Sequence, residues 1–309
     1  MPRDKLLAEI VDADAIICLL RDKIDREFLE NAQKLRVVST MSVGYEHIDV
    51  NECRKRNIRI GYTPDVLTEA TAELALALLL TTSRRICEAV EIAKNRSDYA
   101  TISWAMGYIE RERSGQASQL CAYRSTRIRC VMWNHSCAPS QFFLIRLTQL
   151  AVGRTNTGNG AQRVQWTTNT VDSNDYEYVT FDVLLAQSDF LLICAKATSE
   201  NREIFNAHAF SRMKNDGILV NISRGSLVQH DDLYKALRDG LIGAAGLDVT
   251  EPEPLPTNSP LFELKNCVIL PHIGSATRET REKMRALAEE NALAVLTGQP
   301  MPSELNPYL

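Results

Sequence analysis

Three apolar runs of strand length occur in the last third of the chain, and a polar side chain capable of chemistry stands at or just after the end of each. Arg224 follows the first run, and His272 follows the third. The second run ends in Asp248, with Glu253 shortly beyond it. Histidine exchanges protons near neutral pH, a carboxylate beside it favours its charged form, and a guanidinium group binds carboxylates through paired hydrogen bonds. These four residues are candidates for acid–base chemistry on an anionic substrate.

The elements that must hold these residues alternate between strand and helix along the chain. Continuous apolar runs at 15–20 and 189–194 are typical of strands buried on both faces, and the amphipathic stretch 277–296 is typical of a covering helix. The alternation predicts an α/β fold with parallel sheets, in which ligands bind at the carboxyl ends of the strands. The segment 68–80 is apolar around most of its circumference, so we expect a buried helix there.

A second candidate site is the turn Ser42–Gly44, between an apolar strand and a helix. A glycine permits a tight turn that directs backbone N–H groups outward, and such groups at a helix start suit a carboxylate. Taken alone, these residues favour a plain strand-to-helix turn. Tyr45 and His47 are expected to lead into the helix and not to act in catalysis.

Composition sets limits on the class of protein. The chain has 309 residues, enough for two modest domains, and a formal net charge of −4 that argues against a nucleic-acid or acidic-membrane partner. No apolar run is long enough to span a membrane and no secretory signal is evident, so we expect a cytoplasmic protein. The eight cysteines are scattered singly and fit no standard zinc pattern, so neither disulfides nor a metal site is expected.

Three short motifs resemble the signatures of the D-2-hydroxyacid dehydrogenase family: Asn221–Gly225, Gly246–Val249 followed by Glu253, and Pro271–Gly274. The stretches 40–44, 61–67, 254–257 and 300–305 are most similar to the glyoxylate/hydroxypyruvate reductase branch of that family. The resemblance covers roughly residues 5–95 and 178–306.

Residues 96–177 do not resemble the family. A dinucleotide-binding enzyme needs a strand, the pattern Gly-x-Gly-x-x-Gly and a helix, and this pattern occurs nowhere in the chain. The nearest alternative, Gly158–Arg163, has arginine in place of the third glycine. The segment is rich in arginine and contains all three tryptophans, which is weak support for RNA binding. A mis-spliced or out-of-frame exon and a genuine replacement of the segment both remain open.

The resemblance implies two doubly wound parallel-sheet domains. Residues 1–85 and 277–309 would form a flavodoxin-like substrate domain that lacks its first strand and helix, and residues 86–276 a Rossmann dinucleotide-binding domain that is aberrant in its first half. The family also implies a homodimer, with the helix at 68–80 in the dimer contact.

The resemblance further implies reduction of a small 2-keto acid, hydroxypyruvate or glyoxylate, to the D-2-hydroxy acid, with NADPH favoured over NADH. His272 would be the proton donor and Glu253 its partner, both catalytic together with Arg224. The remaining implied assignments are substrate binding by Val43, Gly44 and Arg224, and cofactor binding by Ser223, Asp248 and Gly274. Two other interpretations are a catalytically inactive form and a corepressor-like binding protein of the same family. Without a glycine cradle for pyrophosphate, we expect NADPH to bind weakly.

Overall fold

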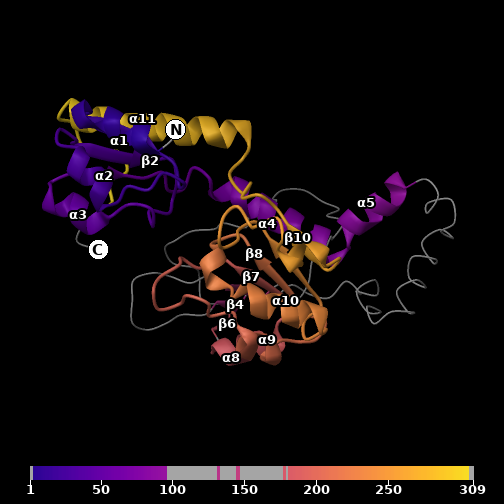
Figure 1. Ribbon diagram of the computed structural model, residues 1–309. Helices are drawn as coiled ribbons and strands as arrows, with labels where there is room; N and C mark the ends of the chain where they lie inside the picture. Colours follow the sequence, from indigo (N-terminus) through magenta and orange to yellow (C-terminus); the bar gives the residue numbers. More distant parts are fainter. Residues whose placement is uncertain (1–2, 96–130, 133–143, 147–176, 179, 306–309) are drawn as a thin grey trace, which may run out of the picture. The chain divides into compact units, whose positions relative to one another are not determined.

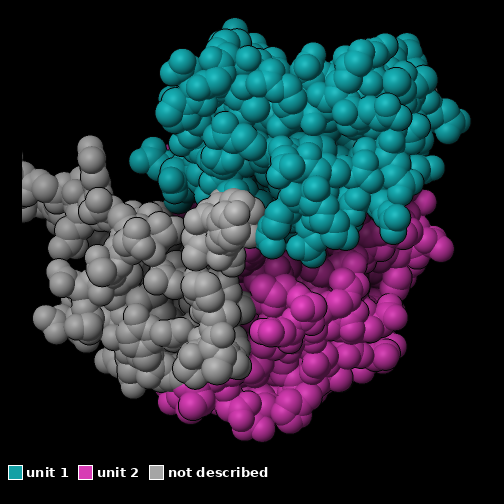
Figure 2. Space-filling view, turned by 90° about the vertical axis from the view of Figure 1, so that its left-hand side faces the viewer, with its two compact units in different colours: residues 1–71, 275–309 teal, residues 72–274 magenta. Residues whose placement is uncertain are grey.

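The computed structural model describes residues 3–95, 131–132, 144–146, 177–178 and 180–305 (Figure 1). The chain divides into two compact units, coloured separately in Figure 2. Unit 1 consists of residues 1–71 and 275–309, and unit 2 of residues 72–274.

Unit 1 is built on a three-stranded parallel sheet of order β1-β2-β3, in which Ala15 of β1 pairs with Val37 of β2. Its elements in chain order are α1 (Arg3–Glu9), η1 (Ile10–Asp12), β1 (Ala15–Cys18), α2 (Arg26–Asn31), β2 (Val37–Thr40), α3 (Val50–Lys55), β3 (Arg59–Gly61) and α11 (Arg278–Leu296).

Helices cover both faces of this sheet because its central strand is apolar on both sides. Val38 packs with Phe28 of α2 on one face. Its neighbour Val37 points to the other face and packs with Ala292 and Val295 of α11. Strand β2 is therefore buried between two helical layers. The burial on both faces predicted for 15–20 is wrong for β1, because this strand lies at the edge of the sheet and its Ile17 is 43% exposed.

Buried polar contacts attach the end of the chain to unit 1. The fully buried Asn291 of α11 donates through Nδ2 to the carbonyl oxygen of Tyr62 at 3.1 Å, and its Oδ1 accepts from the N–H of Ser303 at 2.8 Å. The N–H of Leu305 donates to the carbonyl oxygen of Ile60 at 2.8 Å. The segment after α11 thus runs along β3 and covers the open edge of the sheet.

Unit 2 contains most of α4 (Thr68–Ser83) and the largest sheet. The other elements are α5 (Ile86–Lys94), β4 (Val131–Met132), β5 (Leu144–Arg146), β6 (Glu177–Tyr178), α8 (Phe181–Gln187), β7 (Phe190–Ile193), α9 (Ala207–Arg212), β8 (Ile218–Asn221), η3 (Gly225–Leu227), α10 (His230–Arg238), β9 (Ala244–Leu247), η4 (Pro260–Glu263) and β10 (Cys267–Ile269).

The large sheet has the order β10-β9-β8-β7-β5, and its first four strands are parallel. Leu219 of β8 packs with Phe210 of α9 and Leu233 of α10 on one face. Val220, the next residue, packs with Leu78 of α4 on the other face. Both faces of the parallel strands are covered, which confirms the α/β class and the two parallel sheets.

The far edge of this sheet differs from the all-parallel expectation. Strand β5 pairs with β7 in the antiparallel direction, and β4 and β6 form a separate two-stranded parallel pair. An antiparallel strand at the edge of a parallel sheet needs no right-handed helical crossover, so such mixed sheets are physically accessible.

The predicted full burial of the helix at 68–80 is wrong for part of its surface. Leu78 and Leu79 of α4 are 1% and 3% exposed, but Leu76 and Leu80 are 43% and 36% exposed. A helix that is apolar on all sides has more apolar surface than one sheet can cover. Leu76 and Leu80, which lie one turn apart, therefore stay exposed among the described residues.

Candidate active site

The carboxyl ends of β8, β9 and β10 meet at one edge of the parallel sheet in unit 2. Ser223 and Arg224 follow β8, Asp248 follows β9, and His272 follows β10 after a short link. Parallel strands in adjacent register bring these ends together. The alignment that the apolar runs predicted is therefore present.

His272 and Glu253 form a direct pair at this edge. Nδ1 of His272 lies 2.9 Å from Oε2 of Glu253, and the two side chains are 29% and 39% exposed. His272 has a backbone φ of 55°, in the left-handed region that non-glycine residues seldom adopt. Because Nδ1 is occupied by the carboxylate, Nε2 is the ring nitrogen left to meet a substrate.

Several groups determine the charge of Glu253. Burial raises the pKa of its carboxyl, but the hydrogen bond and charge of His272, the N–H of Thr250 at 3.1 Å and the charge of Arg224 together bring the pKa below its usual value. Glu253 is therefore ionised at neutral pH, as a partner for an imidazolium must be. The charge of Arg224 is the smallest of these influences on the pKa of Glu253.

Asp248 holds the loop that carries His272. It is 1% exposed, its Oδ1 accepts from the N–H of Ile273 and its Oδ2 from the N–H of Gly274, both at 2.8 Å. The N–H of His272 donates to the carbonyl oxygen of Asp248 at 2.9 Å. Burial raises the pKa of the Asp248 carboxyl, and the two backbone N–H groups partly offset this. Asp248 thus fixes the backbone of the loop that carries His272. The predicted contact of Asp248 with a cofactor stays a prediction.

The loop after β8 is pressed against the loop after β9 at Gly225. A Cβ atom at this position would lie 2.5 Å from the backbone nitrogen of Glu251 and closer still to the carbonyl group of Thr250. Only glycine permits this approach. It brings Arg224, whose Nη1 donates to the carbonyl oxygen of Ser223 at 2.8 Å, alongside the residues that precede Glu253.

Ser223 is bound into the same edge. Its hydroxyl donates to the carbonyl oxygen of Ala195, which follows β7, and its N–H donates to Oδ1 of Asn221 at 3.1 Å. Nδ2 of Asn221 donates to the carbonyl oxygen of Arg224 at 2.8 Å. Asn221 is fully buried at the end of β8, so it fixes the backbone that presents both Ser223 and Arg224.

The Val43–Gly44 turn belongs to unit 1, where it follows β2. Val43 is 41% exposed and Gly44 is buried. Among the described residues, no hydrogen bond acceptor is found for the N–H group of either residue. The turn therefore has two backbone donors available for an anion, which is what a carboxylate-binding turn requires.

Three residues near these sites were missed by the sequence analysis. Thr250 supplies a backbone donor to Glu253. Thr40 and His47 belong to a chain of hydrogen bonds behind the Val43–Gly44 turn, although His47 was expected only to lead into a helix. No sequence pattern marks these contacts, because they join residues whose proximity depends on the fold.

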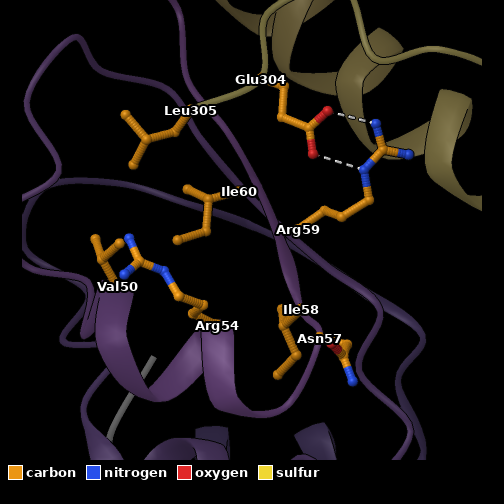
Figure 3. Close-up of a pocket in the computed structure, with 8 residues that line it drawn as sticks. All are labelled: Val50, Arg54, Asn57, Ile58, Arg59, Ile60, Glu304 and Leu305. Carbon is orange, nitrogen blue, oxygen red and sulfur yellow. Dashed lines mark hydrogen bonds and ion pairs between the residues drawn. The ribbon is translucent and has the colours of Figure 1, made fainter. Parts of the chain in front are cut away.

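A separate pocket of about 270 Å³ lies in unit 1 (Figure 3). Arg59 and Glu304 form a bidentate ion pair at its edge, with N–O distances of 2.7 and 2.6 Å. Its lining residues are Val50, Arg54, Asn57, Ile58, Arg59, Ile60, Glu304 and Leu305. None of the predicted site residues lines this pocket.

Two kinds of feature are absent from the described residues. No group of three or more His, Cys, Asp or Glu side chains within them is arranged to hold a metal ion. Across the same part of the chain, no helix is both long and apolar enough to cross a membrane.

Comparison with known proteins identifies the family. Residues 151–274 match the family model of the NAD binding domain of D-isomer specific 2-hydroxyacid dehydrogenases. The chain is 44% identical over 313 residues to glyoxylate reductase/hydroxypyruvate reductase of Homo sapiens, which covers 99% of this chain and 88% of the human protein. The chain belongs to the D-isomer specific 2-hydroxyacid dehydrogenase family. It is thus a member of a family of NAD(P)-dependent oxidoreductases, as its motifs indicated.

Solved structures of other proteins share this fold. The TT0316 protein of Thermus thermophilus superposes with a TM-score of 0.75 at 32% identity, over 99% of this chain and 90% of that one. An NADPH-dependent glyoxylate/hydroxypyruvate reductase of Sinorhizobium meliloti, in complex with NADP and malonate, gives a TM-score of 0.71 at 26% identity, over 97% and 86% of the two chains.

The family match corrects one boundary of the sequence analysis. The motifs placed the start of the second matching region at residue 178. The match to the family model begins at residue 151, so residues 151–177 also belong to that region. This stretch lacks the glycine signature on which the sequence analysis depended. The interpretation of residues 96–150 lies outside the described residues, apart from 131–132 and 144–146.

Proposed function

We propose that this dehydrogenase reduces a small 2-keto acid, hydroxypyruvate or glyoxylate, to the D-2-hydroxy acid with NADPH or NADH. The observation that carries the proposal is the His272–Glu253 pair at 2.9 Å, at the same sheet edge as Arg224. Relatives named for these substrates, including the human and Sinorhizobium reductases, support the same choice.

Reduction of a ketone adds a hydride to the carbonyl carbon and a proton to the carbonyl oxygen. The bound nicotinamide supplies the hydride. His272 donates the proton from Nε2, since Nδ1 is engaged by Glu253. The ionised Glu253 stabilises the imidazolium before transfer and keeps the ring oriented while the proton leaves.

Substrate binding is assigned to Arg224 and to the Val43–Gly44 turn. The guanidinium group of Arg224 can bind a carboxylate or a ketone oxygen with two parallel N–H groups. The two backbone N–H groups of the turn, which have no acceptor among the described residues, suit a carboxylate.

Cofactor binding is assigned to Ser223, Asp248 and Gly274. The donor set at this edge fits the nicotinamide end of a dinucleotide, because a proton donor and a cation stand at the carboxyl ends of parallel strands. The described residues contain no strand-glycine-helix unit for the pyrophosphate. NADPH is favoured because the Sinorhizobium relative is NADPH-dependent.

The finer domain assignment, flavodoxin-like for residues 1–85 with 277–309 and Rossmann for 86–276, is part of this proposal.

The test is the loss of NADPH absorbance when hydroxypyruvate or glyoxylate is added to the purified chain. His272→Ala is expected to lower kcat by roughly 10²–10⁴-fold, which is the usual contribution of general acid catalysis. The dissociation constant for NADPH, measured by fluorescence titration, should stay unchanged. His208→Ala is the matched control, because His208 is exposed on α9 and should leave kcat unaltered.

Other outcomes select the alternatives. Cofactor binding without turnover of any 2-keto acid would favour a corepressor-like or inactive family member. A variant His272→Ala with most of its turnover would remove this residue from the mechanism. Very weak NADPH binding would agree with the missing glycine cradle.

A homodimer is part of the proposal and has support in unit 2. Leu76 and Leu80 lie one turn apart on α4, Ile86 and Val90 one turn apart on α5, and all four are at least 36% exposed. Exposed apolar pairs on successive helices suit a surface covered by another protein. Sedimentation velocity would give twice the monomer mass if a second copy covers them.

A further inference from the structure

A chain of hydrogen bonds lies directly behind the Val43–Gly44 turn. Nε2 of His47 is 3.1 Å from Oγ1 of Thr40, which in turn is 2.7 Å from Oγ of Ser42. The Ser42 hydroxyl donates to the carbonyl oxygen of Gly44 at 2.6 Å. Thr40 and Ser42 are 0% and 3% exposed, so water does not compete for these bonds.

The direction of each bond in this chain follows from counting protons. A carbonyl oxygen only accepts, so the single proton of the Ser42 hydroxyl is used on Gly44. Thr40 must therefore donate to Ser42, and its own oxygen is left to accept from His47. His47 must carry a proton on Nε2. The geometry thus assigns a proton to Nε2 of His47, which also lies 3.6 Å from Sγ of Cys18, and fixes the orientation of both hydroxyls.

Backbone hydrogen bonds hold the polypeptide in place before and after the turn. The N–H of Met41 donates to the carbonyl oxygen of Cys18 at 2.9 Å, and the N–H of Thr63 donates to that of Ser42 at 3.0 Å. The N–H of Ile24 donates to the carbonyl oxygen of His47 at 2.9 Å, which holds the histidine backbone in place. Among the described residues, the N–H groups of Val43 and Gly44 have no acceptor.

We propose that His47 is a positioning residue that acts through Thr40 and Ser42 to fix the Val43–Gly44 N–H groups for the substrate carboxylate. The hydrogen-bond chain holds the Gly44 carbonyl oxygen and so fixes the peptide plane after Gly44, while the N–H of Thr63 holds the Ser42 carbonyl oxygen and so fixes the plane that carries the Val43 N–H. The Val43–Gly44 peptide, which carries the Gly44 N–H, lies between these two fixed planes. Preorganised donors bind a ligand more tightly because no ordering is required on binding. The inference rests on the proposed function, since it names the carboxylate of that substrate as the anion.

The test uses pairs of variants that remove or keep each link. Thr40→Val removes a hydroxyl with little change in volume, and Thr40→Ser retains it. His47→Leu removes the ring donor, and His47→Gln restores an N–H donor. We expect Thr40→Val and His47→Leu to raise KM for hydroxypyruvate about 3- to 10-fold, the effect of one ordinary hydrogen bond, with kcat and the NADPH dissociation constant unchanged. Thr40→Ser, His47→Gln and the control His208→Leu should stay within about twofold of the wild type.

Two spectroscopic measurements separate this inference from the proposed function. In the wild type, a long-range ¹H–¹⁵N spectrum should show His47 protonated at Nε2, and titration with malonate should shift the amide signals of Val43 and Gly44. These shifts should require a several-fold higher malonate concentration in Thr40→Val.

Each result decides one claim. An unchanged KM in both Thr40→Val and His47→Leu, or a neutral His47 ring protonated only at Nδ1, would overturn the inference. If the wild type reduces no 2-keto acid, the proposed function fails. Amide shifts with malonate that weaken in Thr40→Val would then still support the positioning role of His47, for a different carboxylate.

Discussion

Gly225→Ala tests whether close packing of two loops assembles the candidate active site. Gly225 follows Arg224 in the loop after β8, and its backbone touches the loop after β9 at Thr250 and Glu251. The second loop leads directly to Glu253. An added methyl group would therefore push apart the loops that bring Arg224 and Glu253 together, without removing any functional side chain.

The size of the effect follows from the contact distances. The new Cβ would lie 2.5 Å from the backbone nitrogen of Glu251 and closer still to the carbonyl group of Thr250, whereas ordinary van der Waals contact begins at 3.4 Å, so one loop must move by at least about 1 Å. Overpacking of a dense region typically costs about 1–3 kcal/mol, and backbone atoms yield less readily than side chains. A misplacement of about 1 Å in an active site can lower turnover by about 10²-fold.

The assay combines urea unfolding with steady-state kinetics. Gly225→Ala is expected to lower the unfolding free energy by about 2–3 kcal/mol and kcat/KM by at least 10-fold. The matched control is Gly240→Ala. Gly240 has a φ of 69° but no atom within 4 Å of an added Cβ, so its variant should cost about 1 kcal/mol from backbone strain and leave kinetics unchanged. Equal stability and kinetics in Gly225→Ala and the wild type would refute the packing argument.

Three further predictions concern the charge and reactivity of single side chains. Arg224→Lys should chiefly raise KM for hydroxypyruvate, since an ammonium group cannot form the bidentate contact, and an unaltered KM would contradict the substrate role. The pKa of Glu253 is held below its usual value in the fold, so its ionisation stabilises the protein above pH about 4.5, and that contribution is lost as the pH falls through the lower folded pKa. Urea unfolding between pH 3 and pH 6, about the range of carboxylate titration, should therefore show a weaker acid dependence in Glu253→Gln. Burial raises the pKa of Cys18 to about 12, so mass-spectrometric mapping after treatment with a thiol reagent at pH about 8 should find the exposed Cys87 labelled and Cys18 unmodified.

Local patterns in the sequence predicted many of the strands and helices of the fold. The apolar runs at 189–194 and before Arg224 predicted the strands that the structure forms as β7 and β8. Successive side chains of a strand point to opposite faces, so Val37 and Val38 of β2 are covered from two sides. The same rule applied to Leu219 and Val220 of β8. Patterning failed for α4, where composition predicts burial but cannot say how much of the surface a single sheet will cover.

The sequence likewise predicted one part of the candidate site and could not predict another. The order Arg224, Glu253, His272 could be read from the chain, because each residue stands beyond an apolar run and parallel strands bring their carboxyl ends to one edge. The 2.9 Å contact between the His272 ring and Glu253 could not be predicted from the sequence. It depends on the left-handed backbone at His272 and on the hydrogen bonds of Asp248 to the N–H groups of the next two residues.

The sequence by itself therefore determined the strands, the class of fold, the family and the types of residue that gather at the strand ends. Only the tertiary structure decided which of them touch. Thr40 and Ser42 share the stretch 40–44, but His47 lies outside it and becomes a hydrogen-bond donor to Thr40 only because the chain returns from the turn to the end of β2. Hydrogen bonds depend on distances of a few tenths of an ångström, and such distances are set by packing across the whole unit and not by the spacing of residues along the chain.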